Sequence, residues 1–314
     1  MHDILLVSLG GTAGLREADA GLAASLRRAG ATVEVAAAEP PPEVRTLALT
    51  DLVWARAARQ AASRAPVARA TIYSSVTAAL LAPRLGAIRF DAPAAGNRPG
   101  RHGVWQRGRE RRVLRDAPLL MPWSAGGLAE VAWPHGPALI VPVAVEASGA
   151  PAEVRDVAAI TYGANPEKKG IDRVLEAWRE ARGPGEELLV AGLEGAAEPG
   201  VRYLGGLPRD AYRALLRRAR VFVSAPRRED YGIAQLEALA DGCALVTTPS
   251  PGPYAALPLA RALDPQLVTD DLAPAIRRGL DRPAADAAAL LGPWREAAVD
   301  RVIREELLPR LLGA

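Results

Sequence analysis

The stretch that decides the fold runs from Arg220 to Thr248 and reads RVFVSAPRREDYGIAQLEALADGCALVTT. It begins with a short apolar run and a polar turn, and an apolar-periodic segment then leads into a second apolar run. This order predicts a strand, a loop, a helix and a second strand, as in a parallel sheet covered by helices. Two carboxylates stand eight residues apart in it, Glu229 in the loop and Glu237 inside the helix.

The start of the predicted helix favours a polar or negatively charged ligand. With a helix beginning near Gly232, the first backbone N–H groups have no partner inside the helix, and the positive end of the helix dipole lies beside them. Such a helix start suits a phosphate or a sugar hydroxyl. Eight residues of helix rise by roughly 12 Å at most, which spaces the two acids to hold opposite ends of one ligand. The alternative is an ordinary cap at Glu229 and a solvated helix position at Glu237.

The segment from Pro226 to Gly242, PRREDYGIAQLEALADG, resembles the E-x7-E signature of retaining glycosyltransferases with the GT-B fold, in particular glycosyltransferase family four. The resemblance implies an α/β fold of two doubly wound, Rossmann-like parallel-sheet domains that face a cleft. It places Glu229 at the hydroxyls of the donor sugar and Glu237 at the ribose hydroxyls. The backbone amides that it places at the sugar and phosphate are those of Tyr231, Gly232 and Ile233.

Composition fits a two-domain globular protein. A chain of 314 residues suits two domains of about 150 residues each, and 49% hydrophobic with 24% charged residues is typical of a soluble protein. The formal charge of +3 permits an acidic ligand or a membrane surface without requiring nucleic acid. Cys243 is the single cysteine, which excludes an intrachain disulfide. Without a signal-peptide pattern or a membrane-spanning apolar stretch, the expected location is cytoplasmic, with peripheral membrane contact left open.

The chain opens on an apolar run, Asp3–Ser8, followed by glycines and a helical pattern from Leu15 to Ala29. This predicts the strand, turn and helix that begin a doubly wound sheet. Gly10 and Gly11 could form only a tight turn or could let the backbone approach a ligand, and the resemblance favours contact with the donor or acceptor. Dinucleotide binding is a weak competitor, because LGGTAG does not match G-x-G-x-x-G, although Glu34 lies where a ribose-binding acid would.

Both halves of the chain alternate strands with helices. We expect six strands in the first half, the last at Ala138–Val143, and a boundary at the segment 146–153, which lacks large apolar residues. The predicted domains are 1–147 on the acceptor side, 148–298 for the nucleotide sugar, and a C-terminal helix, 299–314, that can pack back on the first domain. After Thr248 we expect a short strand near Arg261–Leu263 and helices from Asp271, Ala284 and Asp300. Two such halves predict a cleft between them.

A second loop carries a candidate cation. The segment 162–170, YGANPEKKG, resembles the family pattern G-R-x-x-x-x-K-G, whose arginine and lysine bind the diphosphate of a nucleotide sugar. Lys169 matches the lysine, Asn165 is a further candidate donor contact, and Ala164 stands where the family has arginine. We hypothesise that Arg227 or Arg228 replaces that arginine. A preplaced cation stabilises the charge that builds on a departing diphosphate.

Other candidate positions are sparser. The resembling family often has a histidine near the sugar, but the tract IRFDAP offers only Asp91, which we take as a possible sugar or acceptor contact. No D-x-D motif occurs and the three histidines lack ligand spacing, so we expect no metal site and no cofactor, with the nucleoside-diphosphate sugar as co-substrate. Basic residues gather between Arg98 and Arg115, namely Arg98, Arg101, His102, Arg107, Arg111 and Arg115. They form either a solvated helix face or a docking surface for acidic lipid headgroups or a phosphorylated acceptor.

The sequence therefore predicts a metal-independent, retaining hexosyltransferase that moves a sugar from a nucleoside diphosphate to an acceptor hydroxyl of a glycan, lipid or small molecule. Glu229 and Lys169 are the predicted catalytic residues. The alternatives are a sugar-nucleotide epimerase or a phosphorylase on the same fold. A third alternative is a weakened sugar-nucleotide binding protein, which Ala164 and the missing histidine would suit.

Overall fold

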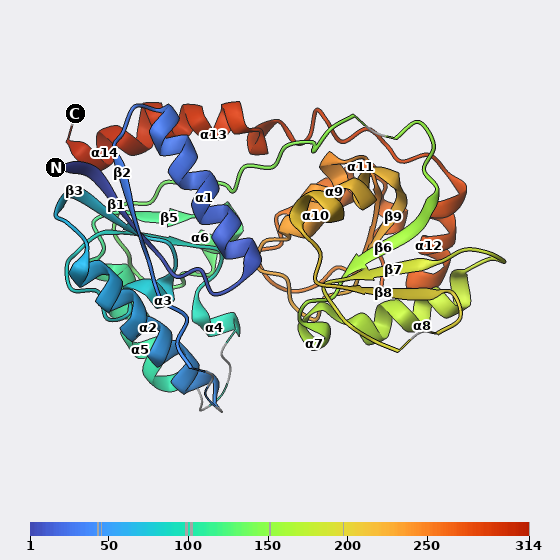
Figure 1. The fold of residues 1–314 in the computed structure, drawn as a ribbon, viewed down its shortest axis with the longest axis horizontal. Coiled ribbons are helices and arrows are strands. Elements are labelled where there is room, and N and C mark those ends of the chain that lie inside the picture. The colour runs from blue at the N-terminus through green and yellow to red at the C-terminus, as the bar shows by residue number, and fades with distance from the viewer. Residues whose placement is uncertain are drawn as a thin grey trace. The chain divides into compact units, whose positions relative to one another are not determined.

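The computed structural model describes residues 1–42, 44, 46–97, 100, 103–150, 152–196 and 198–313. The chain forms two compact units, the N-terminal unit of Met1–Ala144 with Pro293–Ala314 and the C-terminal unit of Val145–Gly292. In the described residues each unit holds one five-stranded sheet whose strands are all parallel. Helices cover both faces of each sheet (Figure 1). The predicted doubly wound α/β architecture is therefore confirmed for both halves.

The N-terminal sheet has the strand order β2-β1-β3-β4-β5. Its strands are β1 His2–Ser8, β2 Val33–Ala37, β3 Ala68–Tyr73, β4 Ala87–Phe90 and β5 Leu120–Pro122, and the helices between them are α1 Ala13–Arg28, α2 Leu47–Arg64, α3 Val76–Ala79, α4 Ala94–Asn97, α5 Val104–Asp116 and α6 Ala125–Ala129. Alternate residues of β1 enter different cores, Ile4 and Leu6 on one face and Leu5 and Val7 on the other. This period of two places a hydrophobic layer on each face of the sheet.

The last segment of the chain packs on the N-terminal unit. It comprises α13 Glu296–Val302, a π-helical turn Ile303–Leu307 and α14 Leu308–Leu312. Val299, Ile303 and Leu307 are buried in the core that also holds Ile4 and Leu6. Arg28 of α1 donates to both carboxylate oxygens of Asp300, at 2.6 and 2.9 Å. The chain returns to this unit at Pro293 rather than at the residue 299 expected from the sequence.

The C-terminal sheet has the strand order β10-β9-β6-β7-β8. Its strands are β6 Val157–Tyr162, β7 Leu188–Ala191, β8 Val201–Gly205, β9 Ala219–Ser224 and β10 Ala244–Thr247, and its helices are α7 Pro166–Lys169, α8 Ile171–Ala181, α9 Arg209–Arg218, α10 Ile233–Ala240, α11 Ala256–Leu263 and α12 Leu272–Asp281. Trp178 of α8 and Ile276 of α12 pack with Val221 and Val223 of β9 in one core.

Three predicted elements are wrong. Ala138–Val143 runs beside β5 through bonds such as Leu139 N–H to Leu120 O, 2.9 Å, but forms only an isolated bridge, because Pro122 of β5 has no N–H to donate to the Leu139 carbonyl oxygen. The expected strand at 261–263 is instead the end of α11, a case in which a short apolar run fits a helix equally well. No helix begins at Ala284, since the Asp286 carboxylate accepts the Ala288 N–H in a local turn.

Each sheet has one point at which the strand order reverses. In the N-terminal unit this switch point lies between β1 and β3, and in the C-terminal unit it lies between β6 and β9. Ligands of open α/β sheets bind outside the carboxyl ends of the strands at such a point. In the C-terminal unit the two loops at that position are residues 163–170 after β6 and 225–232 after β9.

Truncating Ile303 tests the contribution of the returning segment. Ile303→Ala should lower the free energy of unfolding of the N-terminal unit by about 2–5 kcal/mol, the usual cost of a cavity in a packed core. Chemical denaturation followed by circular dichroism measures the change, with the exposed neighbour Glu305→Ala as the matched control. Equal stability of the two variants would contradict the packing described here.

Candidate functional site

The loops 163–170 and 225–232 are bound to one another at the switch point of the C-terminal unit. The Arg227 N–H donates to the carbonyl oxygen of Lys168 at 3.0 Å. Gly170 has a φ of +60° and lies so close to the carbonyl oxygen of Ala225 that a Cβ atom there would collide with it. Glycine is therefore required where the two loops meet.

Glu229 is the buried centre of this arrangement. Its Oε2 accepts from Lys169 Nζ at 2.6 Å and from Gln235 Nε2 at 3.1 Å. Gln235 also donates to Ser224 Oγ, at 2.9 Å, so it connects the carboxylate to the end of β9. The Glu229 N–H donates to the carbonyl oxygen of Pro251 at 3.0 Å. Both the backbone and the carboxylate of Glu229 are thus fixed, and a lysine faces the carboxylate.

A second ion pair lies next to the first. Lys168 Nζ is 2.6 Å from Asp230 Oδ2, and Arg228 Nε is 2.8 Å from Asp230 Oδ1. Burial acts to raise the pKa of Asp230, but Lys168 and Arg228 outweigh it, so the pKa lies below its ordinary value. Asp230 is therefore ionised at neutral pH and holds two cations.

Helix α10 starts beside these ion pairs. Gly232 precedes it with a φ of +91°, and a Cβ at this position would lie 2.8 Å from the ring of Tyr254. No hydrogen bond among the described residues uses the N–H groups of Gly232 and Ile233. Two backbone donors and the positive end of the helix thus lie next to the pair of Lys169 and Glu229.

Glu237 lies one turn further along α10 and is also buried. Its Oε1 is 2.8 Å from Arg209 Nη2 and 3.3 Å from Arg213 Nη1, both on α9. Arg213 also donates to Asp241 Oδ2 at 2.6 Å and to the carbonyl oxygen of Glu146 at 2.7 Å. The second acid of the motif is therefore an ion-paired group with its charge balanced, and not a solvated helix residue.

The remaining donor-side candidates have structural contacts. Asn165 caps α7, its Oδ1 accepting from the Lys168 N–H at 3.1 Å. Arg227 pairs with Asp172 of α8 at 2.7 Å and donates to the carbonyl oxygen of Glu167. Because Arg228 binds Asp230, both arginines proposed as replacements are engaged within the unit. Among the described residues no contact supports either of them as the missing arginine. Tyr231 is buried, and its carbonyl oxygen accepts from Ala255 N–H at 3.0 Å.

In the N-terminal unit the predicted glycine turn lies at the switch point after β1. Gly10 adopts a φ of +59°, and its carbonyl oxygen accepts from Arg16 Nη1 at 2.9 Å. Gly11 is exposed beside the indole ring of Trp54. Asp91 turns back on its own loop, its Oδ1 accepting from the Ala92 N–H at 2.8 Å. The structure thus places these candidates at the carboxyl ends of β1 and β4.

The predicted basic surface is described only in part, because Arg98, Arg101 and His102 lie outside the described residues. Arg107 donates to the carbonyl oxygen of Gly100, Arg111 lies over the ring of Trp133 at 5.4 Å, and Arg115 pairs with Asp116. Each of these three side chains therefore has a partner within the unit.

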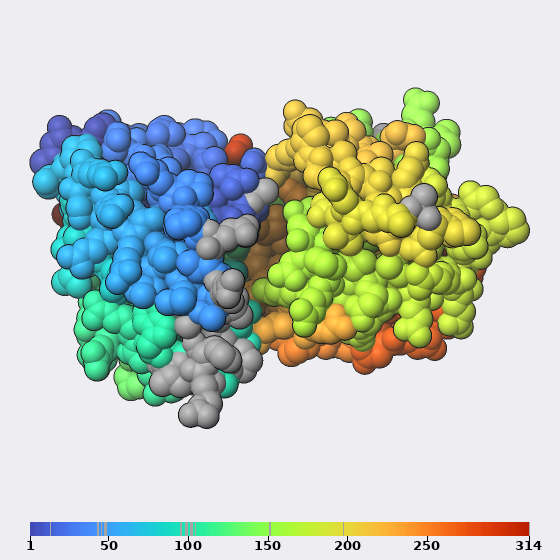
Figure 2. All heavy atoms as spheres, turned by 60° about the horizontal axis from the view of Figure 1, so that its bottom comes forward, coloured from blue at the N-terminus to red at the C-terminus, as the bar shows by residue number. Residues whose placement is uncertain are grey.

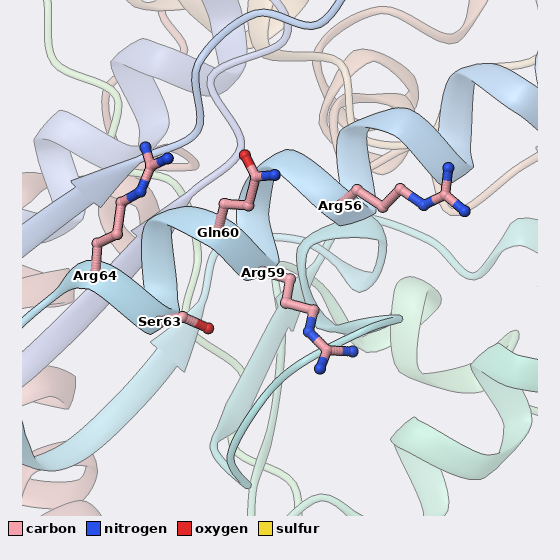
Figure 3. A pocket seen from close by; sticks show the side chains of 5 residues that line it. All are labelled: Arg56, Arg59, Gln60, Ser63 and Arg64. Carbon is pink, nitrogen blue, oxygen red and sulfur yellow. The ribbon is translucent and has the colours of Figure 1, made fainter.

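Helix α2 carries basic side chains that the sequence reasoning did not single out. Its surface faces the viewer, in blue, in Figure 2. A shallow hollow there is lined by Arg56, Arg59, Gln60, Ser63 and Arg64. Figure 3 shows that these side chains spread along the helix and do not converge on a point. We therefore assign them no ligand site of their own, although they add positive charge to this face.

Among the described residues, no group of three or more His, Cys, Asp or Glu side chains could hold a metal ion. The described helices also include none that is both long and apolar enough to cross a bilayer.

The site contains residues that the sequence reasoning missed. Gln235, Asp230 and Lys168 take part in the ion-pair cluster, and Arg209 and Arg213 hold Glu237. Gln235 could have been noticed as a polar side chain within the otherwise apolar run IAQL. The pairing of Lys168 with Asp230 has no local signal, because the two residues are 62 positions apart.

Away from this site, Glu110 of α5 is a buried acid in the N-terminal unit. Both of its oxygens accept from the Ala94 N–H, at 2.9 and 2.8 Å. Burial raises the pKa of Glu110 to about 7; the Ala94 N–H opposes this rise, Asp51 adds to it, and Arg107 and Arg111 oppose it. Its ionisation is therefore unfavourable in the folded state.

This pKa predicts a pH-dependent stability. A carboxyl whose pKa is raised from 4.5 to about 7 on folding costs nothing below about pH 4.5, and its penalty grows until the pH passes 7, to roughly 3 kcal/mol at most. Denaturant unfolding from pH 5 to pH 8 should therefore show a loss of stability that is smaller in Glu110→Gln. An identical pH profile for the variant and the wild type would rule out this origin.

Comparisons with known proteins bear on both the fold and the function. Residues 150–257 match the family model described as glycosyl transferases group 1. A comparison with curated protein sequences found no match. Solved structures share the fold at low sequence identity, and three of them are described next.

WaaG, a glycosyltransferase involved in lipopolysaccharide biosynthesis, has a TM-score of 0.68 at 15% identity, over 99% of this chain and 100% of that chain. The α,α-trehalose-phosphate synthase (UDP-forming) from Burkholderia xenovorans has a TM-score of 0.66 at 14% identity, over 100% of both chains. The pneumococcal O-GlcNAc transferase GtfA, solved with UDP and GlcNAc, has a TM-score of 0.58 at 14% identity, over 83% of this chain and 60% of that chain.

These findings confirm the GT-B fold that the sequence predicts. The match of residues 150–257 to this family model, together with the shared fold, supports a transferase enzyme that uses a sugar donor. The comparisons do not favour any of the three alternatives weighed from the sequence, an epimerase, a phosphorylase and a binding protein. Membership of family four and the E-x7-E signature remain predictions.

Proposed function

We propose that this protein is a metal-independent, retaining glycosyltransferase that moves a sugar from a nucleoside diphosphate to an acceptor hydroxyl. The observation that carries the proposal is the pair of Lys169 and Glu229, 2.6 Å apart, beside the start of α10. It combines a cation for the leaving diphosphate with a carboxylate for sugar hydroxyls at the switch point of an open α/β sheet.

The diphosphate is bound by the positive side of this site. Lys168, Lys169 and Arg228 supply three positive charges, and Glu229 and Asp230 supply two negative charges, so the cluster has a net charge of +1. The N–H groups of Gly232 and Ile233 add two donors with no protein partner among the described residues. Fixed donors of this kind stabilise the charge on a departing phosphate without reorganising.

The sugar and the nucleoside are held by the two acids of the motif. Glu229 accepts hydrogen bonds from hydroxyls of the donor sugar, in an orientation fixed by Gln235. Glu237 binds the ribose, and its buried carboxylate is held by the ion pairs with Arg209 and Arg213. Asn165 and Arg227 remain weaker candidate contacts, because both are engaged in the loops themselves.

The reaction proceeds on one face of the sugar. The bond between the anomeric carbon and the diphosphate oxygen breaks while the acceptor oxygen bonds to the same face, which retains the configuration. The acceptor proton passes to the departing diphosphate oxygen. Lys169 and the start of α10 stabilise the negative charge that develops there, which is the role a metal ion would otherwise take.

The acceptor belongs to the N-terminal unit in this proposal. Gly10 and Gly11 offer exposed backbone at the end of β1, and Asp91 follows β4. Of the similar structures, the trehalose-phosphate synthase is named UDP-forming and GtfA was solved with UDP and GlcNAc, which supports a nucleoside-diphosphate donor here.

Substitution of the pair tests the proposal. With UDP-, GDP-, ADP- and TDP-sugars as donors, the wild type should release nucleoside diphosphate in the presence of EDTA. Glu229→Gln and Lys169→Met should each lower kcat/KM by about 10²- to 10³-fold, as for loss of one preorganised group. The exposed α8 residue Glu180 gives the control variant Glu180→Gln, which should match the wild type.

Proton NMR of the product supplies the stereochemical arm of the same experiment. The anomeric configuration of the transferred sugar should equal that of the donor. Inverted product or dependence on added metal would refute the proposed mechanism, and unchanged turnover in Glu229→Gln would refute the assigned site.

We further propose that the protein makes peripheral contact with an anionic membrane surface. This second proposal concerns what the protein binds and not the reaction it catalyses. The exposed arginines of α2 and α5 support it, since basic side chains near anionic lipids contribute about 1 kcal/mol each. In liposome co-sedimentation, the wild type should pellet with phosphatidylserine vesicles and much less with phosphatidylcholine vesicles. Arg56→Glu with Arg59→Glu should weaken this binding, whereas equal sedimentation with both vesicle types would end the proposal.

A further inference from the structure

The chain has only two lysines, Lys168 and Lys169, and they are adjacent. Each pairs with one of two adjacent acids of the opposite loop, Lys168 with Asp230 and Lys169 with Glu229, both at 2.6 Å. Two parallel ion pairs therefore connect the loop after β6 with the loop after β9. Although they look equivalent in the sequence, their surroundings differ.

The ion pairs of Asp230 have a structural role. Its side chain is 5% exposed and contacts two cations, Lys168 and Arg228. Moving Lys168 away would break a 2.6 Å ion pair of a buried carboxylate and leave it with Arg228 alone, which is unfavourable. We therefore expect Lys168 to stay on Asp230 when the donor binds, even though 39% of its side chain is exposed.

Glu229 is paired in a way that allows exchange. Lys169 is the one cation in contact with it among the described residues, and its other partner, Gln235, is neutral. An arriving diphosphate competes for Lys169, while the hydroxyls of the attached sugar can replace that lysine as donors to Glu229. This pair thus balances its own charges until the donor brings both replacement partners.

Helix α7, which carries both lysines, depends on contacts outside itself. It has four residues, from Pro166 to Lys169, and a single helical turn of this length is not stable alone. Besides the pair of Lys169 and Glu229, three bonds hold it to the other loop: Lys168 to Asp230, the Arg227 N–H to the Lys168 carbonyl oxygen, and Arg227 Nη1 to the Glu167 carbonyl oxygen. Of these three bonds, only the one between Lys168 and Asp230 involves a buried charged side chain, that of Asp230.

We propose that Asp230 is a positioning residue that acts through Lys168: it fixes α7 so that Lys169 meets the donor diphosphate, while Lys168 itself is not a donor ligand. This inference rests on the proposed function. It divides two neighbouring lysines into one that exchanges partners during the reaction and one that stays bound. It also accounts for a single lysine facing the donor in a loop that has Ala164 in place of the family's arginine.

A double-mutant cycle between Asp230→Asn and Lys169→Met tests the inference. The probe is whichever of UDP, GDP, ADP and TDP gives the wild type the largest thermal shift, and the readouts are its Kd by calorimetry and kcat/KM with the matching sugar donor. Asp230→Asn alone should weaken both by about tenfold, the size of coupling seen between contacting residues. In the Lys169→Met background, the same substitution should change them by less than about twofold.

Further variants separate positioning from general stability. Lys168→Met should behave like Asp230→Asn, whereas Lys168→Arg, which keeps the charge, should retain most activity. Glu186→Gln is the matched control: Glu186 pairs with Arg220 and Arg277 of the same unit but precedes β7, at the amino end of the sheet. It should lower the melting temperature without changing Kd.

The outcomes distinguish the inference from the function on which it rests. If no nucleoside diphosphate binds the wild type, or if Lys169→Met binds it normally, the proposed function fails. If Lys169→Met is impaired but Asp230→Asn is equally harmful with and without Lys169, then Asp230 does not act through that lysine and the inference is overturned. A Lys168→Met variant with normal Kd and kcat/KM would overturn it as well.

Discussion

The arrangement of the C-terminal unit depends on one contact between two loops that follow neighbouring parallel strands. Lys168 and Lys169 on one loop pair with Asp230 and Glu229 on the other. A backbone hydrogen bond from the Arg227 N–H to the Lys168 carbonyl oxygen also joins the two loops. Such close approach brings charges out of water, so each buried carboxylate must have its own cation. The result is a rigid, slightly positive rim at the switch point of the sheet.

The backbone conforms to this contact through glycines at positions where a side chain would not fit. Gly170 lies against Ala225, and Gly252, with a φ of +108°, lies against the carbonyl oxygen of Glu229. Gly232 turns the chain into α10 beneath Tyr254. These three residues let the loops come close enough for the two ion pairs to form. The backbone of the site then needs no rearrangement when the donor binds, and only Lys169 changes its partner.

The sequence was sufficient for the parts of this account that depend on local pattern. The order of strand, loop and helix around Glu229 is confirmed, because apolar periodicity and glycine turns act over short distances. The strand expected at Ala138–Val143 was wrong, since an apolar run does not reveal that its neighbour β5 has a proline, Pro122, where the ladder needs an N–H donor.

Only part of the site could be predicted from the sequence. The family resemblance selected Glu229, Glu237 and Lys169, and their roles remain proposals. The partners of Glu237 come from α9, 24 and 28 positions earlier in the chain for Arg213 and Arg209. Nothing in the sequence shows which of many arginines will meet a given acid, because that choice depends on how α9 and α10 pack.

The most direct test of the central claim is a crystal structure of the protein with a bound nucleoside-diphosphate sugar. The account predicts that the diphosphate contacts Lys169 Nζ and the N–H groups of Gly232 and Ile233, that sugar hydroxyls donate to Glu229, and that the bond between Lys168 and Asp230 is unchanged. A donor bound elsewhere, with Lys169 still on Glu229, would contradict it.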